Sequence, residues 1–159
     1  MVSDHERSDH AVATLSDIEQ QAVDNPSPYA KTHIGQYLES DGQDVDHPMA
    51  DDLILLHTTG KRSGQIRRTP LASYDDGGDL IVIASKGGSP EHPSWYWNLQ
   101  ADPTVWVRDK AEFYEARAEV LGEAERAEVW PRVTAWNPNF QAYQDKTDRT
   151  IPLVRLVRV

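Results

Sequence analysis

Apolar residues in this chain gather in short runs. Leu53–Leu56 and Leu80–Ala84 are dense in Leu, Ile and Val, and turn residues bound both runs. Such runs are too short for helices and are typical of buried strands. Over Ala111–Val120, charged and apolar positions alternate, which predicts a strand with one wet face. In all, the pattern predicts six strands, at about 53–59, 67–74, 80–85, 104–108, 111–120 and 153–157.

Helices are predicted before, between and after these strands. A short helix is expected over 15–23, and a second should begin at Pro28, where Ser27 can cap it. Further helical segments are predicted after Pro93 to about Gln100, over 122–135 and over 140–143. Six short strands with a few helices predict an α+β domain built on a small β-barrel.

Charge divides the chain in two. The formal net charge is −10, and residues 1–52 hold 12 acidic and two basic residues while 53–159 hold 14 of each. We therefore predict an acidic N-terminal leader with helices over 1–52 and a neutral barrel domain over 53–159. Residues 1–13 lack large apolar side chains and are predicted to be disordered. The acidic balance argues against general nucleic-acid binding, which needs a positive surface.

Several classes of protein are disfavoured by what the sequence lacks. It has no cysteine, so disulfides and thiolate metal sites are excluded. No metal site is expected, because no histidine or carboxylate cluster has ligand spacing. No apolar run approaches the roughly 20 residues of a membrane span, and the N-terminus is unlike a signal peptide. We therefore expect a soluble, cytoplasmic protein.

The histidines have ordinary structural interpretations. His5 and His10 fall in the leader, and His33 is predicted to be solvated on the second helix. His57 lies in a predicted strand and is expected to be partly buried and hydrogen-bonded.

Four cations mark the first candidate site. Lys61, Arg62, Arg67 and Arg68 fall within the stretch from 53 to 74, which contains no acidic residue. Because a strand alternates its faces, only one of Arg67 and Arg68 should face a ligand together with Thr69. A solvated hairpin tip is the alternative interpretation of such a basic turn.

A second candidate site follows the third predicted strand. Ser85-Lys86-Gly87-Gly88 combines a hydroxyl, a cation and open backbone. This combination suits an anionic ligand with phosphate or carboxylate groups. An ordinary strand-ending turn remains the alternative.

Three strings then carry a resemblance to a known family. TTGKRSGQIRRTPL, ASKGGSPEHPSWYWNL and QAYQDKTDRTIPLV, in this order, resemble the deazaflavin-dependent nitroreductase family, which uses coenzyme F420. The resemblance spans Leu53 to Val159. It implies a split β-barrel like the FMN-binding barrel of flavin reductases, with peripheral helices. It also implies an oxidoreductase that transfers a hydride from the reduced deazaflavin to a quinone, enone or nitro compound.

The resemblance assigns roles to individual residues. It places Ser85 and Lys86 close to the deazaflavin ring, and from this position we predict catalytic roles for Ser85, Lys86 and Tyr143. Ser85 or Tyr143 is the predicted hydrogen-bond or proton donor, and Lys86 is the predicted cation near the ring. Simple packing is the alternative for Tyr143. The family's nitroimidazole-reducing members carry tyrosines where this chain has Ala72, Asn137 and Phe140, which puts nitroreduction in doubt. The residues implied to bind the cofactor are Lys61, Arg62, Ser63, Arg67, Arg68, Thr69, Pro70, Leu71, Ala72, Ile83, Ala84, Ser85, Lys86, Ser94, Trp95, Tyr96, Trp97, Asn98 and Phe140.

Two other functions stay open at this point. The same barrel could bind FMN, or the chain could be a noncatalytic carrier of F420. The oligomeric state is also open; Trp106, Trp130 and Trp136 are candidates for a homodimer contact. If the acceptor is a quinone, the protein could work at the membrane surface without spanning it.

Overall fold

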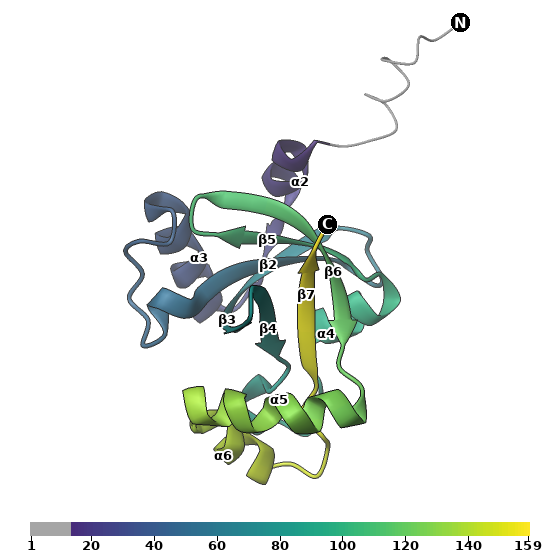
Figure 1. The fold of residues 1–159 in the computed structure, drawn as a ribbon. Helices are drawn as coiled ribbons and strands as arrows, with labels where there is room; N and C mark the ends of the chain where they lie inside the picture. Colours follow the sequence, from purple (N-terminus) through teal and green to yellow (C-terminus); the bar gives the residue numbers. More distant parts are fainter. Residues whose placement is uncertain (1–13) are drawn as a thin grey trace, which may run out of the picture.

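The computed structural model describes residues 14–159, and its strands form one sheet that closes on itself. The order is β1-β3-β2-β5-β6-β7-β4, and β3 also pairs with β4, so strands β2 to β7 complete a barrel (Figure 1). All pairs in the barrel are antiparallel. The predicted six-stranded split barrel is confirmed. The strands are β1 (Val23–Asp24), β2 (Leu53–Thr59), β3 (Ile66–Asp76), β4 (Asp79–Ile83), β5 (Thr104–Asp109), β6 (Glu112–Val120) and β7 (Leu153–Arg158).

The helices lie outside the barrel. In Figure 1, α5 crosses its lower end with α6 beneath, α2 lies at the top, and α3 and α4 lie on opposite sides. The predictions for residues 1–13, including His5 and His10, lie outside the described residues. The helices are α2 (Leu15–Gln21), α3 (Pro28–Ser40), α4 (Ser94–Ala101), α5 (Glu123–Trp136) and α6 (Asn139–Asp145), with 3-10 turns at Ala50–Asp52 and Lys86–Gly88.

Local sequence explains where the first two helices begin. Thr14 and Asp17 form a capping box, in which Thr14 Oγ1 accepts from the Asp17 N–H at 3.0 Å. Ser27 caps α3 and Pro28 occupies its first turn, as predicted.

The core has one cluster inside the barrel and others beneath the helices. Ile54, Leu56, Val82 and Trp95 belong to the interior cluster. Another joins α3 to the outer face of β2 and includes Ile34, Tyr37, Leu53 and Leu55. Residues on both sides of the predicted boundary at 52 share this second cluster.

Two side chains are more buried than their sequence context suggested. His33 was expected to be solvated, but only 6% of it is exposed, and its Nε2 lies 3.0 Å from the Asp46 carbonyl. Trp106 was a candidate for a dimer contact, but it is buried with Ile18 and Ile66 beneath α2. The helix that covers Trp106 comes from a distant stretch of sequence, whereas the loop that covers His33 follows 13 residues later; neither contact is visible in the local pattern.

One element was not predicted at all. Val23 and Asp24 form β1, which pairs in parallel with Arg67 and Arg68 of β3. As a result, α2 ends at Gln21 instead of running to residue 23. No helix within residues 14–159 combines the length and the apolar character that a membrane span needs.

Candidate functional site

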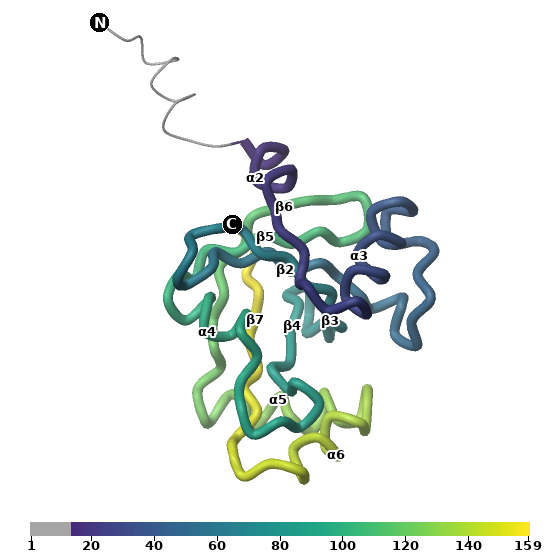
Figure 2. The backbone as a smooth tube through the Cα atoms, turned by 180° about the vertical axis from the view of Figure 1, so that it is seen from behind, coloured from purple at the N-terminus to yellow at the C-terminus, as the bar shows by residue number. Residues whose placement is uncertain are grey.

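A cleft of about 800 Å³ opens beside the barrel, between α4, the β2–β3 turn and the segment that follows β1. Figure 2 shows this side, with the chain after α2 running down between α4 and α3. The lining residues are Asn25, Pro26, Thr58, Gly60, Lys61, Arg62, Ser63, Arg67, Arg68, Thr69, Ser94, Trp95, Trp97 and Asn98. Ten of them were predicted from the sequence as cofactor contacts.

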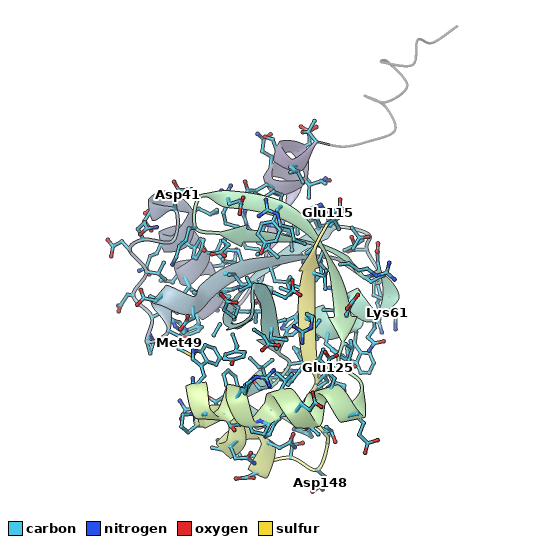
Figure 3. All side chains as sticks on the ribbon, in the orientation of Figure 1. Asp41, Met49, Lys61, Glu115, Glu125 and Asp148 are labelled. Carbon is cyan, nitrogen blue, oxygen red and sulfur yellow. The ribbon has the colours of Figure 1, made fainter. Side chains whose placement is uncertain are left out.

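The β2–β3 turn supplies the cations of one wall. The Gly60 N–H donates to the Gln65 carbonyl at 2.7 Å, and Gly64 has φ +72°, so the turn closes tightly. A Cβ at Gly60 would lie 2.6 Å from Ser63 Oγ and 3.2 Å from the Gln65 carbonyl oxygen, so a larger residue would crowd the closed turn. The turn leaves Lys61 and Arg62 exposed, and Figure 3 shows Lys61 at the outer edge of the molecule.

These cations are available for a ligand. Within residues 14–159, no carboxylate forms an ion pair with Lys61, Arg62 or Arg67. Arg67 pairs across the sheet with Thr58 and shares its face. Arg68 lies on the opposite face, where its Nε donates to Asp24 at 2.5 Å. Arg68 still borders the cleft, but a carboxylate already holds its guanidinium.

Helix α4 supplies the aromatic wall. Trp95 is 8% exposed and belongs to the barrel core, while Trp97 is 47% exposed at the cleft. Asn98 joins the two walls: its Oδ1 accepts from the Lys61 N–H at 2.9 Å, and its Nδ2 donates to Thr58 Oγ1 at 3.1 Å. The helix therefore fixes the turn that carries the cations.

No pattern in the sequence predicted the third wall of the cleft. Asn25 Nδ2 donates to Thr69 Oγ1 at 3.2 Å, and the Asn25 N–H donates to the Arg68 carbonyl at 2.9 Å. Asn25 and Pro26 fall between the helix predicted over 15–23 and the helix predicted from Pro28, a position that by itself indicates only a loop. Thr58 and Gly60 were also missed as lining residues, although both belong to a segment that was singled out.

Comparison with known proteins identifies the family. The model of the F420H(2)-dependent quinone reductase family matches residues 29–158. A Mycobacterium tuberculosis (strain H37Rv) protein named F420H(2)-dependent quinone reductase is 38% identical over 114 residues, which are 70% of this chain and 76% of that protein. The chain belongs to the F420H2-dependent quinone reductase family.

Solved structures agree with this assignment. A structure described as an F420-H2 dependent reductase (FDR-A) is 40% identical with a TM-score of 0.61, covering 66% of this chain and 93% of its own. A second, described as a domain-swapped dimer, is 35% identical with a TM-score of 0.63, covering 83% and 99%. Membership in this family confirms the predicted resemblance, the oxidoreductase class and coenzyme F420 as the cofactor.

The second predicted group of residues does not contribute to the lining of the cleft. Ser85 and Lys86 follow β4, and neither is among the residues that line the cleft. That these two residues act at the same bound cofactor as Lys61 and Arg62 stays a prediction. The Lys86 Nζ lies 3.7 Å from Glu91. The other residues of the F420-binding prediction that do not line the cleft are Pro70, Leu71, Ala72, Ile83, Ala84, Tyr96 and Phe140.

Most of these residues serve the packing. Ala84 and Tyr96 belong to the barrel interior, with Leu71 against it. Phe140 is buried beneath α5 and stacks on Trp136 with ring centroids 5.9 Å apart; Tyr143 packs against the same cluster. The segment Ser85–Gly88 and helix α6 touch each other, because a Cβ on Gly88 would lie 2.8 Å from the Tyr143 carbonyl oxygen. Ser85, Lys86 and Tyr143, for which catalytic roles are predicted, therefore belong to two elements in contact.

Two histidines, His92 and His57, have pKa values below the usual value of 6.5. Burial, with a smaller contribution from Arg149, lowers the pKa of His92 below its usual value. Burial also lowers the pKa of His57 to about 3, with Arg68 adding to the effect. His57 is completely buried, and its Nε2 has no hydrogen-bond partner in the described part of the chain. The expectation of partial burial was therefore wrong, whereas the expected hydrogen bond is present at Nδ1, which lies 3.2 Å from the Leu55 carbonyl oxygen. Within that same part, no three histidine or acidic side chains gather as a metal site.

Proposed function

We propose that this chain binds reduced coenzyme F420 in the 800 Å³ cleft and transfers its hydride to a small quinone. The observation that carries the proposal is the convergence of Lys61, Arg62 and Arg67 with the aromatic end of α4 on one cleft. Neither wall alone would be specific, since basic turns and exposed tryptophans are both common on protein surfaces.

The lining residues fit the chemistry of the cofactor. The resemblance implies a deazaflavin with a phosphodiester and a glutamate tail, so its long arm is anionic. Arg62 and Arg67 can each offer two parallel N–H groups to a phosphate or carboxylate, and Lys61 adds a compact charge. The face of Trp97 offers apolar surface for a flat ring.

The bound cofactor would supply the hydride, and this chain would supply position and electrostatics. The cationic turn holds the tail, and α4 together with Asn25 and Pro26 restricts the position of the remainder. Ser85 and Tyr143 are proposed as hydrogen-bond or proton donors at the acceptor. Lys86 is proposed to stabilise the negative charge that develops during transfer.

A quinone is the preferred acceptor. The matched relatives carry quinone reductase in their names. Ala72, Asn137 and Phe140 offer no phenol hydroxyl, which the nitroimidazole-reducing members have at these positions. Phe140 is also buried against Trp136 and would need to move to reach an acceptor.

Titration and turnover test the proposal in sequence. Purified protein is titrated with F420 and, separately, with FMN, following the absorbance of each. It is then mixed anaerobically with reduced F420 and with a naphthoquinone, an enone or a nitroimidazole. We expect F420 to bind more tightly than FMN, and the naphthoquinone to be reduced fastest. Binding without reoxidation by any acceptor would support the carrier alternative, and preference for FMN would support the flavin alternative.

We also propose that the protein forms a homodimer. A relative that is 35% identical is described as a domain-swapped dimer. Trp130 and Trp136 remain half-buried on α5 and are the remaining candidates for the contact. Light scattering coupled to size exclusion measures the mass; a value near 17.9 kDa would contradict the proposal.

A further inference from the structure

The segment Ala84–Ser89 is called the glycine loop here. The Arg149 side chain donates hydrogen bonds to three backbone carbonyls of this loop. Its Nη1 donates to the Ala84 carbonyl at 3.1 Å, its Nη2 to Ser85 at 2.8 Å and its Nε to Ser89 at 2.8 Å. Nη1 also lies 2.9 Å from His92 Nδ1. One guanidinium thus spans both ends of the loop, which a single ammonium group could not do in the same geometry.

The glycine loop needs such support because its backbone is strained. Lys86, Gly87 and Gly88 follow one another with φ of +44°, +62° and +84°. A left-handed conformation is uncommon for a residue with a side chain, and it persists only where the surroundings enforce it. Lys86 is therefore held by its neighbours in a conformation that it would otherwise leave.

Arg149 is itself fixed from the other side. Gln144 Nε2 donates to the Arg149 carbonyl at 2.7 Å, and Gln144 Oε1 accepts from the Ile151 N–H at 2.9 Å. The segment after α6 therefore has a defined backbone. In Figure 3, Asp148 marks this segment at the lower edge of the molecule.

We propose that Arg149 is a positioning residue: it holds the glycine loop in its left-handed conformation and so sets the places of Ser85 and Lys86. The role in turnover rests on the proposed function, in which these two residues face the reacting groups. Without the guanidinium, the carbonyls of Ala84, Ser85 and Ser89 lose their common partner. The loop then relaxes, and displacements of about 1 Å cost a reaction up to 100-fold in rate.

The substitution Arg149→Lys tests whether Arg149 positions the glycine loop, and Arg126→Lys serves as its matched control. Arg126 holds the same segment, donating from Nε to the Ile151 carbonyl at 2.8 Å and from Nη2 to Gln144 Oε1 at 3.1 Å, but it makes no bond to the glycine loop. We expect Arg149→Lys to lower turnover at saturating reduced F420 and quinone about 10- to 100-fold. The Kd for F420 should change less than about threefold, because the cationic turn is untouched. Equal turnover in the two variants would overturn the proposal.

Chemical rescue separates positioning from general destabilisation. Arg149→Ala should regain part of its turnover when a few millimolar guanidinium ion, about 5 mM and far below denaturing concentrations, is added. Arg126→Ala should gain nothing. If both respond equally, or neither does, Arg149 has no specific role in the loop.

Amide hydrogen exchange measures how firmly the glycine loop is held, and the measurement does not require an active enzyme. The amides of Lys86–Ser89 should exchange at least about tenfold faster in Arg149→Lys than in Arg126→Lys, because charge-assisted bonds are lost. If the wild type does not oxidise reduced F420, the proposed function fails while this measurement still decides the bracing role. Unchanged exchange would overturn the bracing role even in an active enzyme.

If the arginine variants do not fold, Gly88→Ala can be used instead, because it changes the glycine loop and leaves Arg149 in place. Its Cβ would lie 2.8 Å from the Tyr143 carbonyl and 3.0 Å from Lys146 Cβ. Gly77→Ala is the matched variant, since φ is +70° there and a Cβ meets nothing within 4 Å. We expect Gly88→Ala alone to combine faster exchange in the glycine loop with lower turnover. Faster exchange with unchanged turnover would overturn the proposal that the loop sets the places of Ser85 and Lys86.

Discussion

The Asn98 side chain on α4 accepts a hydrogen bond from the Lys61 backbone N–H at 2.9 Å. The same amide donates to Thr58 Oγ1, so one side chain joins the helix to both the end of β2 and the turn that follows it. The cationic and aromatic walls of the cleft are therefore mechanically connected. A ligand that contacts both walls meets a preorganised surface, which reduces the entropy cost of binding.

Asn98→Ala should release the cationic turn from α4. We expect the Kd for F420 to rise about 3- to 10-fold, because about 1 kcal/mol per lost hydrogen bond no longer holds the turn in place. The measurement is a fluorescence titration with F420. Gln100→Ala on the same helix is the control, since Gln100 donates to Tyr96 Oη and does not line the cleft. Equal Kd values for the two variants would contradict this role of Asn98.

Lys61, Arg62 and Arg67 should contribute to binding as charges. Replacing each one singly by Gln should raise the Kd for F420 about tenfold and flatten its dependence on salt, because exposed charges are screened. Titrations at low and high ionic strength measure both effects. Arg158→Gln makes the same change in net charge at an exposed pair with Glu112 and should leave the Kd unchanged. A Kd that rises equally with salt in all four variants would show that net charge alone matters.

Substitution of Trp95 should reduce the stability of the fold, whereas substitution of Trp97 should weaken ligand binding. Trp95 is 8% exposed within the barrel core, so Trp95→Ala should lower the free energy of unfolding by about 3–5 kcal/mol. Trp97 is 47% exposed, so Trp97→Ala should cost less than about 1 kcal/mol and instead weaken F420 binding or raise the KM for the quinone. Urea denaturation and steady-state kinetics measure the two effects. A Trp97→Ala protein with unchanged Kd and KM would remove this residue from the proposed site.

The barrel was predictable because local patterns encode it. Leu53–Thr59 alternates between a side that packs inside the barrel, with Ile54 and Leu56, and a side beneath α3, with Leu53 and Leu55. The run therefore shows no polar face and is typical of a buried strand. The sequence Asp75-Asp76-Gly77-Gly78 is likewise typical of a hairpin turn, and both glycines have positive φ in the turn between β3 and β4.

The third wall of the cleft was not predictable in this way. A two-residue strand has no period, so β1 leaves no pattern in the sequence. The bond between Asn25 and Thr69 joins residues 44 positions apart. Arg149 presents the same difficulty, since its partners lie 57 to 65 positions earlier in the chain. The contacts of Asn25 and Arg149 form only when the barrel closes, so the residues near them in the sequence do not predict these contacts.

His57 should make the stability of the protein depend on pH. Its pKa falls from 6.5 in the unfolded chain to about 3 in the folded protein, first because of burial and then because of Arg68. Between these values the unfolded chain binds a proton that the folded protein does not. The contribution to stability is therefore complete above pH 6.5 and is lost progressively as the pH falls toward 3. At pH 5 the free energy of unfolding should be about 2 kcal/mol lower than at pH 7 from this residue alone.

Comparison with His57→Gln isolates this contribution. His47 and His92 also have lowered pKa values, but they are present in both proteins, so their effect cancels in the difference. Urea denaturation at pH 5 and pH 7 should show a smaller loss in His57→Gln than in the wild type, even if the variant is less stable at both. The His57 ring resonance should also stay constant in NMR spectra between these pH values. A ring that titrates near pH 6.5 in the folded protein would mean that water reaches Nε2 between Trp106 and Phe113, and that the packing beneath α2 is looser than its burial indicates.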